Sequence, residues 1–171
     1  MRQIIRSLPA ALAASAALLA APAGAQIAPG GGPVAWGADR TEYLDAEGVL
    51  KLIGRAELIQ AENRLRANTI DLYTTPSRPG AAGGGGGDVR EVIAVGDVYF
   101  VTPTQVVRGD RAVYTASSDT IVVTGDVILT QGENVMTGSR LTIQVSTSHA
   151  TMDGAPTSAG QRVRGVFYPD E

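Results

Sequence analysis

An internal repeat is the feature of this chain that most restricts its fold. Residues 109–130, GDRAVYTASSDTIVVTGDVILT, align without a gap on residues 38–59, ADRTEYLDAEGVLKLIGRAELI. The offset of 71 residues contains a shorter step of 29 residues. That step carries the Gly-Asp-Val of 96–98 onto 125–127, and the Gly-Asp-Arg of 109–111 onto the Gly-Ser-Arg of 138–140. A fixed period dictates architecture, because each copy folds into one unit that packs on its neighbours.

Each unit has the pattern of two β-strands. Apolar residues or glycine occupy every second position of 50–58, and mostly polar residues lie between them. Residues 92–100 and 121–129 show the same alternation, which is typical of strands buried on one face. Turn sequences at 46–48, 102–104, 117–119 and 131–134 separate these runs. Because the sequence after residue 25 shows no sustained helical period, we expect an all-β fold with almost no helix.

A glycine recurs in the middle of the predicted strands, at Gly54, Gly96 and Gly125. Glycine weakens a strand interior, and it usually marks a bend, a bulge or a close approach of another backbone. All three glycines lie on the apolar parity of their strands. We therefore expect a curved sheet that bends once in every unit.

Composition divides the chain into four segments, one of which contains an insertion. Residues 1–25 have Arg2 and Arg6 before an apolar, Ala-rich run and end in small residues, which predicts a cleaved secretory signal peptide rather than a membrane anchor. Residues 26–37 are expected to be a flexible leader, 38–145 the repeat domain, and 146–171 a C-terminal tail. Residues 75–89 interrupt the repeat with five consecutive glycines and are expected to be a surface loop. They lack the lysine and the strand-to-helix context of a phosphate-binding loop.

Charge and chemistry exclude several functions. Beyond residue 25 the chain has 12 basic and 17 acidic residues, a net charge of −5, with no basic cluster, so a nucleic-acid partner is not expected. There is no cysteine, and His149 is the single histidine. We therefore expect no disulfide, no metal site, no cofactor and no catalytic residues. The recurring aspartates are interpreted as turn caps, because their spacing of 29 does not fit calcium-binding nonapeptides.

The apolar face is the remaining candidate for function. Its side chains could pack against an opposing sheet, since burial of each contributes about 1.5–3 kcal/mol, or they could line a space for an apolar ligand. The repeat also brings Arg40, Arg111 and Arg140 to one equivalent position. A structural ion pair or turn contact is the ordinary interpretation of these arginines. The more specific interpretation is contact with an anionic headgroup, because several convergent arginines recognise phosphate well.

Three motifs carry a resemblance to a known family. GDVYFV at 96–101, GDVILT at 125–130 and GDRAVY at 109–114, together with the predicted signal peptide, resemble the OstA-like family of lipopolysaccharide transport proteins over residues 36–145. The resemblance implies an OstA-like antiparallel β-jellyroll of repeated two-strand units, open along one side. It also implies a periplasmic carrier, not an enzyme, that binds the acyl chains of lipid A and bridges inner-membrane and outer-membrane lipopolysaccharide transport proteins. Head-to-tail homo-oligomers would form by strand addition.

This interpretation assigns two sets of residues. The predicted lipid lining is Leu50, Leu52, Leu58, Val98, Phe100, Tyr114, Val123, Val127, Leu129 and Ile143. The predicted headgroup contacts are Arg40, Arg111 and Arg140. The alternative is a structural β-repeat scaffold module with a dry core and no lipid ligand. An exported hydrolase on a jellyroll would need an acid–base pair that the sequence does not reveal.

Overall fold

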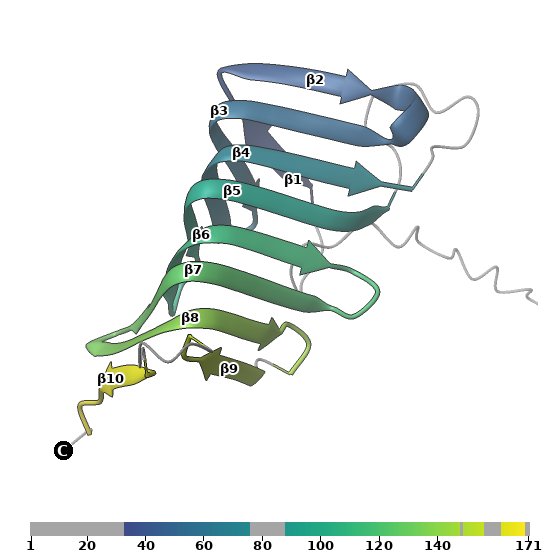
Figure 1. Cartoon of the computed structure of the whole chain (residues 1–171). Coiled ribbons are helices and arrows are strands. Elements are labelled where there is room, and N and C mark those ends of the chain that lie inside the picture. The colour runs from purple at the N-terminus through teal and green to yellow at the C-terminus, as the bar shows by residue number, and fades with distance from the viewer. Residues whose placement is uncertain (1–32, 76–87, 148, 156–161, 170–171) are drawn as a thin grey trace, which may run out of the picture.

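The part of the protein that the structure describes folds into one antiparallel sheet of ten strands (Figure 1). The computed structural model describes residues 33–75, 88–147, 149–155 and 162–169. The strands are β1 (Val34–Gly37), β2 (Arg40–Leu44), β3 (Val49–Gln60), β4 (Asn63–Thr74), β5 (Val89–Val101), β6 (Val106–Thr115), β7 (Thr120–Gln131), β8 (Asn134–Gln144), β9 (His149–Asp153) and β10 (Arg164–Val166). Within these ranges the helical content is one 3₁₀ turn, Asp45–Glu47. The prediction of an all-β fold is confirmed.

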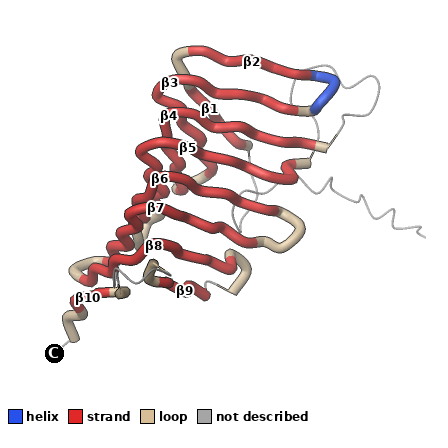
Figure 2. Tube along the Cα trace, viewed as in Figure 1, coloured by secondary structure: helices blue, strands red, loops and turns tan. Residues whose placement is uncertain are grey.

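The strands from β3 to β8 pair in chain order, and each terminal strand of this series also pairs with two short strands on its outer side (Figures 1 and 2). The first half of β3 pairs with β2 and its second half with β1. In β8 the first half pairs with β10 and the second half with β9. The sheet is therefore divided along a crease that crosses every long strand. We call the half that contains β2 and β9 the first wall, and the half that contains β1 and β10 the second wall.

The recurring glycines form the crease. The register between neighbouring strands shifts after Ile53 in β3, after Val95 in β5 and after Thr124 in β7. The glycine that follows each of these positions has a positive φ, of 77° at Gly54, 80° at Gly96 and 105° at Gly125. Residues with a side chain rarely adopt such angles. The predicted bend in every unit is confirmed, and it is a β-bulge.

A short polar side chain from the neighbouring strand or turn lies against each of these glycines. A Cβ atom placed on Gly54 would stand 2.6 Å from Asp39 Oδ2. Asn68 lies in the same way against Gly96, and Asp110 against Gly125. Glycine is therefore required at each bend for two reasons. Its φ is positive, and the neighbouring polar side chain fills the space that a Cβ atom would need.

The strands between the glycine-bearing ones cross the crease differently. In β4 the buried positions change parity, from Ala67 on one side of the crease to Ile70 on the other. In β6 the same change separates Gly109 from Ala112. In each of these strands, the side chains of two successive residues, such as Asn68 and Thr69, therefore face away from the interior. This local irregularity keeps one continuous apolar face on both walls.

The sheet is wider than the repeat domain predicted at 38–145. Strand β1 lies within the predicted leader 26–37, and β9 and β10 lie within the predicted tail 146–171. These short strands satisfy the backbone groups that each half of a creased terminal strand presents on its outer side.

Two sequence predictions fall largely outside the described residues. The signal peptide, 1–25, lies there entirely, and so does most of the Gly-rich insertion, 75–89. The base of the insertion is closed by hydrogen bonds: Thr75 N–H donates to Asp88 O at 2.8 Å, and Asp88 N–H donates to Thr75 Oγ1 at 2.9 Å. In the described part of the chain, no helix is long and apolar enough to cross a membrane.

Candidate functional site: the inner face between the two walls

Apolar side chains run in continuous rows across the inner faces of both walls, because residues directly opposite in neighbouring strands share a face. Nearest the crease, the row on the first wall is Leu52, Ile70, Ala94, Ala112, Val123 and Leu141. Farther from the crease, the first wall carries Leu50, Leu72, Val92, Tyr114, Ile121 and Ile143. The facing row on the second wall is Leu58, Leu65, Phe100, Val107, Leu129 and Met136.

Burial within these rows is deepest at the crease. Leu52, Ile70 and Leu141 are fully hidden from solvent. In the next row of the first wall, Leu72 and Tyr114 each expose 8% of their surface. The side chains therefore shield one another best where the walls join and less toward the free margins of the walls, which we call the rims.

The ten predicted lining residues all lie on the inner face. Seven belong to the buried core cluster: Leu52, Leu58, Val98, Tyr114, Val123, Val127 and Ile143. Leu50, Phe100 and Leu129 are partly buried and pack against that cluster. Mutual burial is what either a lipid-lined groove or a dry core requires, so the lipid contacts of these residues stay a prediction.

Both ends of the rows carry exposed apolar side chains. On β1, Trp36 pairs with Leu58 and is 51% exposed. On β2, Tyr43 pairs with Leu50 and is 41% exposed. At the far end Met136, which pairs with Leu129, is 39% exposed. The apolar surface therefore continues from the edge strands β1 and β2 to β8, which is followed by the edge strand β10. Neither Trp36 nor Met136 was among the predicted lining residues, and their positions follow from the pairing of β1 with β3 and of β7 with β8.

Polar groups close the rim of the first wall. Thr74 Oγ1 donates to the carbonyl oxygen of Gly48 at 3.1 Å, and Thr74 is buried. The Tyr114 hydroxyl lies 3.5 Å from Asp119 Oδ1 in the β6–β7 turn. Burial, and secondarily the Asp119 carboxylate, raise the pKa of Tyr114 above its usual value. The tyrosine is therefore held in its neutral form.

The three predicted headgroup arginines lie on the outer surface. Arg111 and Arg140 both lie opposite Thr124, one on each side of β7. Arg40 lies opposite Ile53 at the far edge and pairs with Glu42. Four strand spacings, about 19 Å, separate Arg40 from Arg111. Only Arg111 and Arg140 are brought near each other, and the headgroup role of all three stays a prediction.

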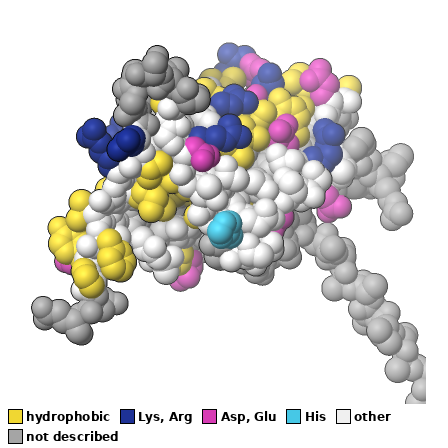
Figure 3. Space-filling model, turned by 60° about the horizontal axis from the view of Figure 1, so that its bottom comes forward, with side chains coloured by type: hydrophobic (Ala, Val, Ile, Leu, Met, Phe, Trp, Pro, Cys, Tyr) yellow, Lys and Arg dark blue, Asp and Glu magenta, His cyan; other side chains and the backbone are white. Residues whose placement is uncertain are grey.

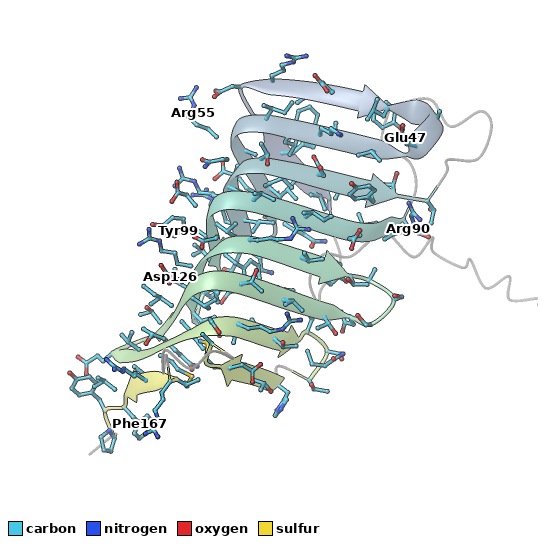
Figure 4. All side chains as sticks on the ribbon, viewed as in Figure 1. Glu47, Arg55, Arg90, Tyr99, Asp126 and Phe167 are labelled. Carbon is cyan, nitrogen blue, oxygen red and sulfur yellow. The ribbon has the colours of Figure 1, made fainter. Side chains whose placement is uncertain are left out.

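An ion pair that sequence reasoning missed lies at the β3 end of the crease, where Figure 4 labels Arg55. Arg55 Nε donates to Asp39 Oδ1 at 2.9 Å and to Oδ2 at 3.2 Å, and a terminal nitrogen of Arg55 also contacts Oδ1. The hydrogen bond from Arg55 lowers the pKa of Asp39, and the same contact raises the pKa of Arg55. The repeat offers a signal for Asp39, because a step of 29 residues leads from it to Asn68, which performs the same packing role at the next bend.

Acidic residues do not gather into a metal site in the part of the chain that the structure describes. No group of three or more His, Cys, Asp or Glu side chains is close enough to hold an ion there. The expected absence of catalytic residues and cofactors stays a prediction.

A creased antiparallel sheet, built from 29-residue units and apolar along its whole inner face, defines the class of open β-jellyrolls. A family model described as "LptA/(LptD N-terminal domain) LPS transport protein" matches residues 37–149. The chain belongs to this family, and the OstA-like resemblance seen in the sequence is confirmed.

The chain is also similar to two other proteins. An uncharacterized protein of Rhizobium meliloti (strain 1021) is 27% identical over 133 residues, which cover 77% of this chain and 69% of the relative. The crystal structure of LptH has a TM-score of 0.66 at 19% identity and covers 80% of this chain and 96% of its own. LptH is described as the LptA-homologous periplasmic component of the conserved lipopolysaccharide transport device of Pseudomonas aeruginosa. This likeness confirms the predicted jellyroll fold.

Proposed function

We propose that this protein is a periplasmic carrier, not an enzyme, that holds the acyl chains of lipid A between its two walls during lipopolysaccharide transport. Membership of the family supports the transport role. The observation that carries the proposal is the continuity of the apolar rows from Trp36 on the edge strand β1 to Met136 on β8, next to the edge strand β10. The eight strands of the main path span about 34 Å, at about 4.8 Å per strand spacing.

The energetic requirement explains why the rows must be continuous. An acyl chain of about 12 carbons gains on the order of 10 kcal/mol when it leaves water, at about 0.8 kcal/mol per methylene. A carrier must therefore offer an apolar surface along the whole length of the chain. The partly buried Leu50, Leu65, Phe100 and Leu129 are the accessible part of that surface.

The crease determines how the walls could admit a lipid. Covalent strand continuity joins the walls at Gly54, Gly96 and Gly125, while the rims on the other side are separate hairpin ends. A small rotation about the crease would expose the second row of the first wall before the fully buried first row. This geometry supports lipid access from the rim side.

The sheet edges support the proposed assembly. The outer edges of β1 and β2 and of β9 and β10 end the sheet, so each presents backbone groups on one side. Such edges suit strand addition. We infer that they join the carrier head to tail with further copies, or with inner-membrane and outer-membrane lipopolysaccharide transport proteins.

A matched pair of neighbouring aromatic residues on β5 tests lipid binding. Phe100 belongs to the inner row, whereas Tyr99 is 38% exposed on the outer surface. A photo-crosslinking amino acid at Phe100 is expected to capture lipopolysaccharide, and the same group at Tyr99 is not. Equal capture at both positions, or capture at Tyr99 alone, would contradict the proposal.

The dry-core alternative makes a different thermal prediction. A ligand that binds only the folded state raises the melting temperature as its concentration increases. We expect purified lipopolysaccharide to raise the Tm of this protein. An unchanged Tm at a saturating lipid concentration, together with no crosslinking at Phe100, would favour the scaffold module.

A further inference from the structure

An apolar pocket of about 300 Å³ lies at the end of the second wall, between β7, β8 and the C-terminal segment. Its lining is Leu129, Gln131, Asn134, Val135, Met136, Gly165, Val166 and Phe167. Leu129 and Met136 are also the last members of the inner apolar row. The pocket is therefore continuous with the inner face. It was not recognised in the sequence, where residues 146–171 were interpreted as a tail.

Strand β10 builds the outer wall of this pocket. Its three residues pair with residues 135–137 of β8, and Gly165 lies opposite Met136. Directly after β10, Tyr168 N–H donates to Asn134 Oδ1 at 2.8 Å. These two contacts hold Phe167 between them, although its side chain is 75% exposed. Figure 3 shows hydrophobic side chains grouped at this end of the molecule.

The pocket has the size and chemistry of a site for one hydrocarbon chain. A water molecule occupies about 30 Å³ of liquid, and a methylene group is similar in size, so the pocket holds roughly ten such groups. Its body is formed by Leu129, Met136, Val166 and Phe167. A peptide strand is a poor occupant, because β10 already pairs with this part of the β8 edge.

Two carboxamides add a polar element to the pocket. Asn134 Oδ1 already accepts a hydrogen bond from Tyr168, which leaves the Asn134 amide nitrogen to donate. Gln131 lines the pocket beside it and can donate or accept. An alkyl chain that carries an oxygen atom, such as an acyl carbonyl or a hydroxyl, matches this combination better than a pure hydrocarbon does.

We propose that this pocket is the terminal subsite of the inner face, that it takes a single acyl chain, and that Phe167 forms its lip. The inference deepens the proposed function and rests on it for the source of the chain. The same chemistry would also be supplied by a free fatty acid, so the experiment separates the two sources.

Tryptophan quenching tests the subsite directly. The chain has one tryptophan, Trp36, at the opposite edge of the sheet. The double variant Trp36→Phe/Phe167→Trp places a single indole in the pocket wall, and 11-bromoundecanoic acid is the probe, because bromine quenches an indole that it touches. We expect saturable quenching, at least threefold stronger than when the indole is placed at position 168 instead.

Two further variants control for non-specific partitioning. Trp36→Phe/Tyr168→Trp moves the indole by one residue to a position that does not line the pocket, and it should be quenched at least threefold less than the Phe167→Trp protein. Adding Met136→Glu to the Phe167→Trp protein should remove the quenching, and circular dichroism should show that the exposed substitution leaves the sheet intact. Equal quenching at positions 167 and 168, or quenching that survives Met136→Glu, would overturn the subsite.

Competition with lipopolysaccharide identifies the source of the chain. Relief of quenching by lipopolysaccharide would show that lipid A reaches the subsite, whereas relief by lauric acid alone would assign it to free fatty acids and overturn the link to transport. Capture at Phe100 without quenching at position 167 would overturn the subsite and leave the proposed function intact. Quenching without any capture at Phe100 would support the pocket and contradict the proposed function.

Discussion

Asp39 and Gly54 contact each other twice across the crease. The Asp39 N–H donates to the Gly54 carbonyl oxygen at 2.9 Å, and the Asp39 carboxylate fills the space in which a side chain on residue 54 would begin. Asn68 and Asp110 fill the corresponding space at the next two bends. At each bend, one glycine thus packs against one short polar residue. This contact joins the two walls at a fixed position.

Replacing a crease glycine should cost more stability than replacing a turn glycine. Gly54→Ala meets both a positive φ and the Asp39 carboxylate, whereas Gly132→Ala, in the β7–β8 turn, meets a positive φ with nothing within 4 Å. A strained φ costs about 1–3 kcal/mol. We expect Gly54→Ala to lose at least about 1 kcal/mol more than Gly132→Ala in urea unfolding. Equal losses would show that the fitted contact is unimportant.

Neighbouring valines on β6 should differ in their effect on stability. Val107 is fully buried on the inner face, and Val106 is 37% exposed. Val107→Ala removes two buried methyl groups and should lower the free energy of unfolding by about 2 kcal/mol. Val106→Ala should change it by less than about 0.5 kcal/mol. Chemical denaturation of the two variants measures this difference, and similar values would contradict the assignment of the inner face.

A charged residue introduced on the inner face should have different effects at buried and at partly exposed positions. Only at a partly exposed position should it stop lipid binding without unfolding the protein. Leu52 and Val127 are almost completely buried, so Leu52→Asp or Val127→Asp should prevent folding. Phe100→Asp should retain the fold and reduce lipopolysaccharide retention at least tenfold, and Tyr99→Asp should leave retention unchanged. A pull-down with immobilised lipopolysaccharide, checked by circular dichroism, measures both. Undiminished retention by folded Phe100→Asp would contradict a lipid site on the inner face.

The Asp39–Arg55 pair should give an acid-dependent contribution to stability. The hydrogen bond from Arg55 lowers the pKa of Asp39 in the folded state, so the stabilisation is present above the unfolded pKa of about 4 and is lost as the pH falls through the folded pKa. Carbon-detected NMR titration should find a lower Asp39 pKa in the unaltered protein than in Arg55→Gln. The two proteins should differ in stability at pH 7 and converge at pH 2. A pH-independent difference would exclude this ion pair as its cause.

Tyr114 should make the protein sensitive to alkali. Burial raises its pKa in the folded state, so its contribution to stability is complete below the unfolded pKa of about 10 and is lost as the pH rises through the folded pKa. Between pH 7 and pH 11 the unaltered protein should lose more stability than Tyr114→Phe does. Unfolding curves at the two pH values provide the measurement, and parallel losses would show that Tyr114 ionises as readily as in the unfolded chain.

The sequence predicted the long strands because their alternation is local. The inner-face positions of Leu52, Val98 and Val127 follow from parity alone, and the bends follow from the recurrence of one glycine per unit. The change of parity in β4, after Ala67, was also visible in the sequence, because polar residues interrupt the alternation at Asn68 and Thr69. That interruption indicates where a strand crosses the crease.

Other features depend on partners distant in the chain and could not be predicted. Strands β1 and β10 have four and three residues, too few to show a period, and they exist because β3 and β8 offer edges to them. The contact of Asp39 with Gly54 depends on the pairing of strands, which no local pattern determines. The pocket beside Phe167 likewise depends on where β10 docks.

Repetition of the glycine bend makes the cross-section of this molecule the same at every step along the stack of strands. Each 29-residue unit contributes two strands, or about 10 Å of length, and it repeats the same crease, the same rows and the same rims. Length is thus independent of shape: duplication of one unit would extend the apolar surface without changing its width. Only the terminal strands must fit the partner that they contact. Differences in partner should therefore appear in the sequences of β1, β2, β9 and β10, and differences in cargo length should appear in the number of units.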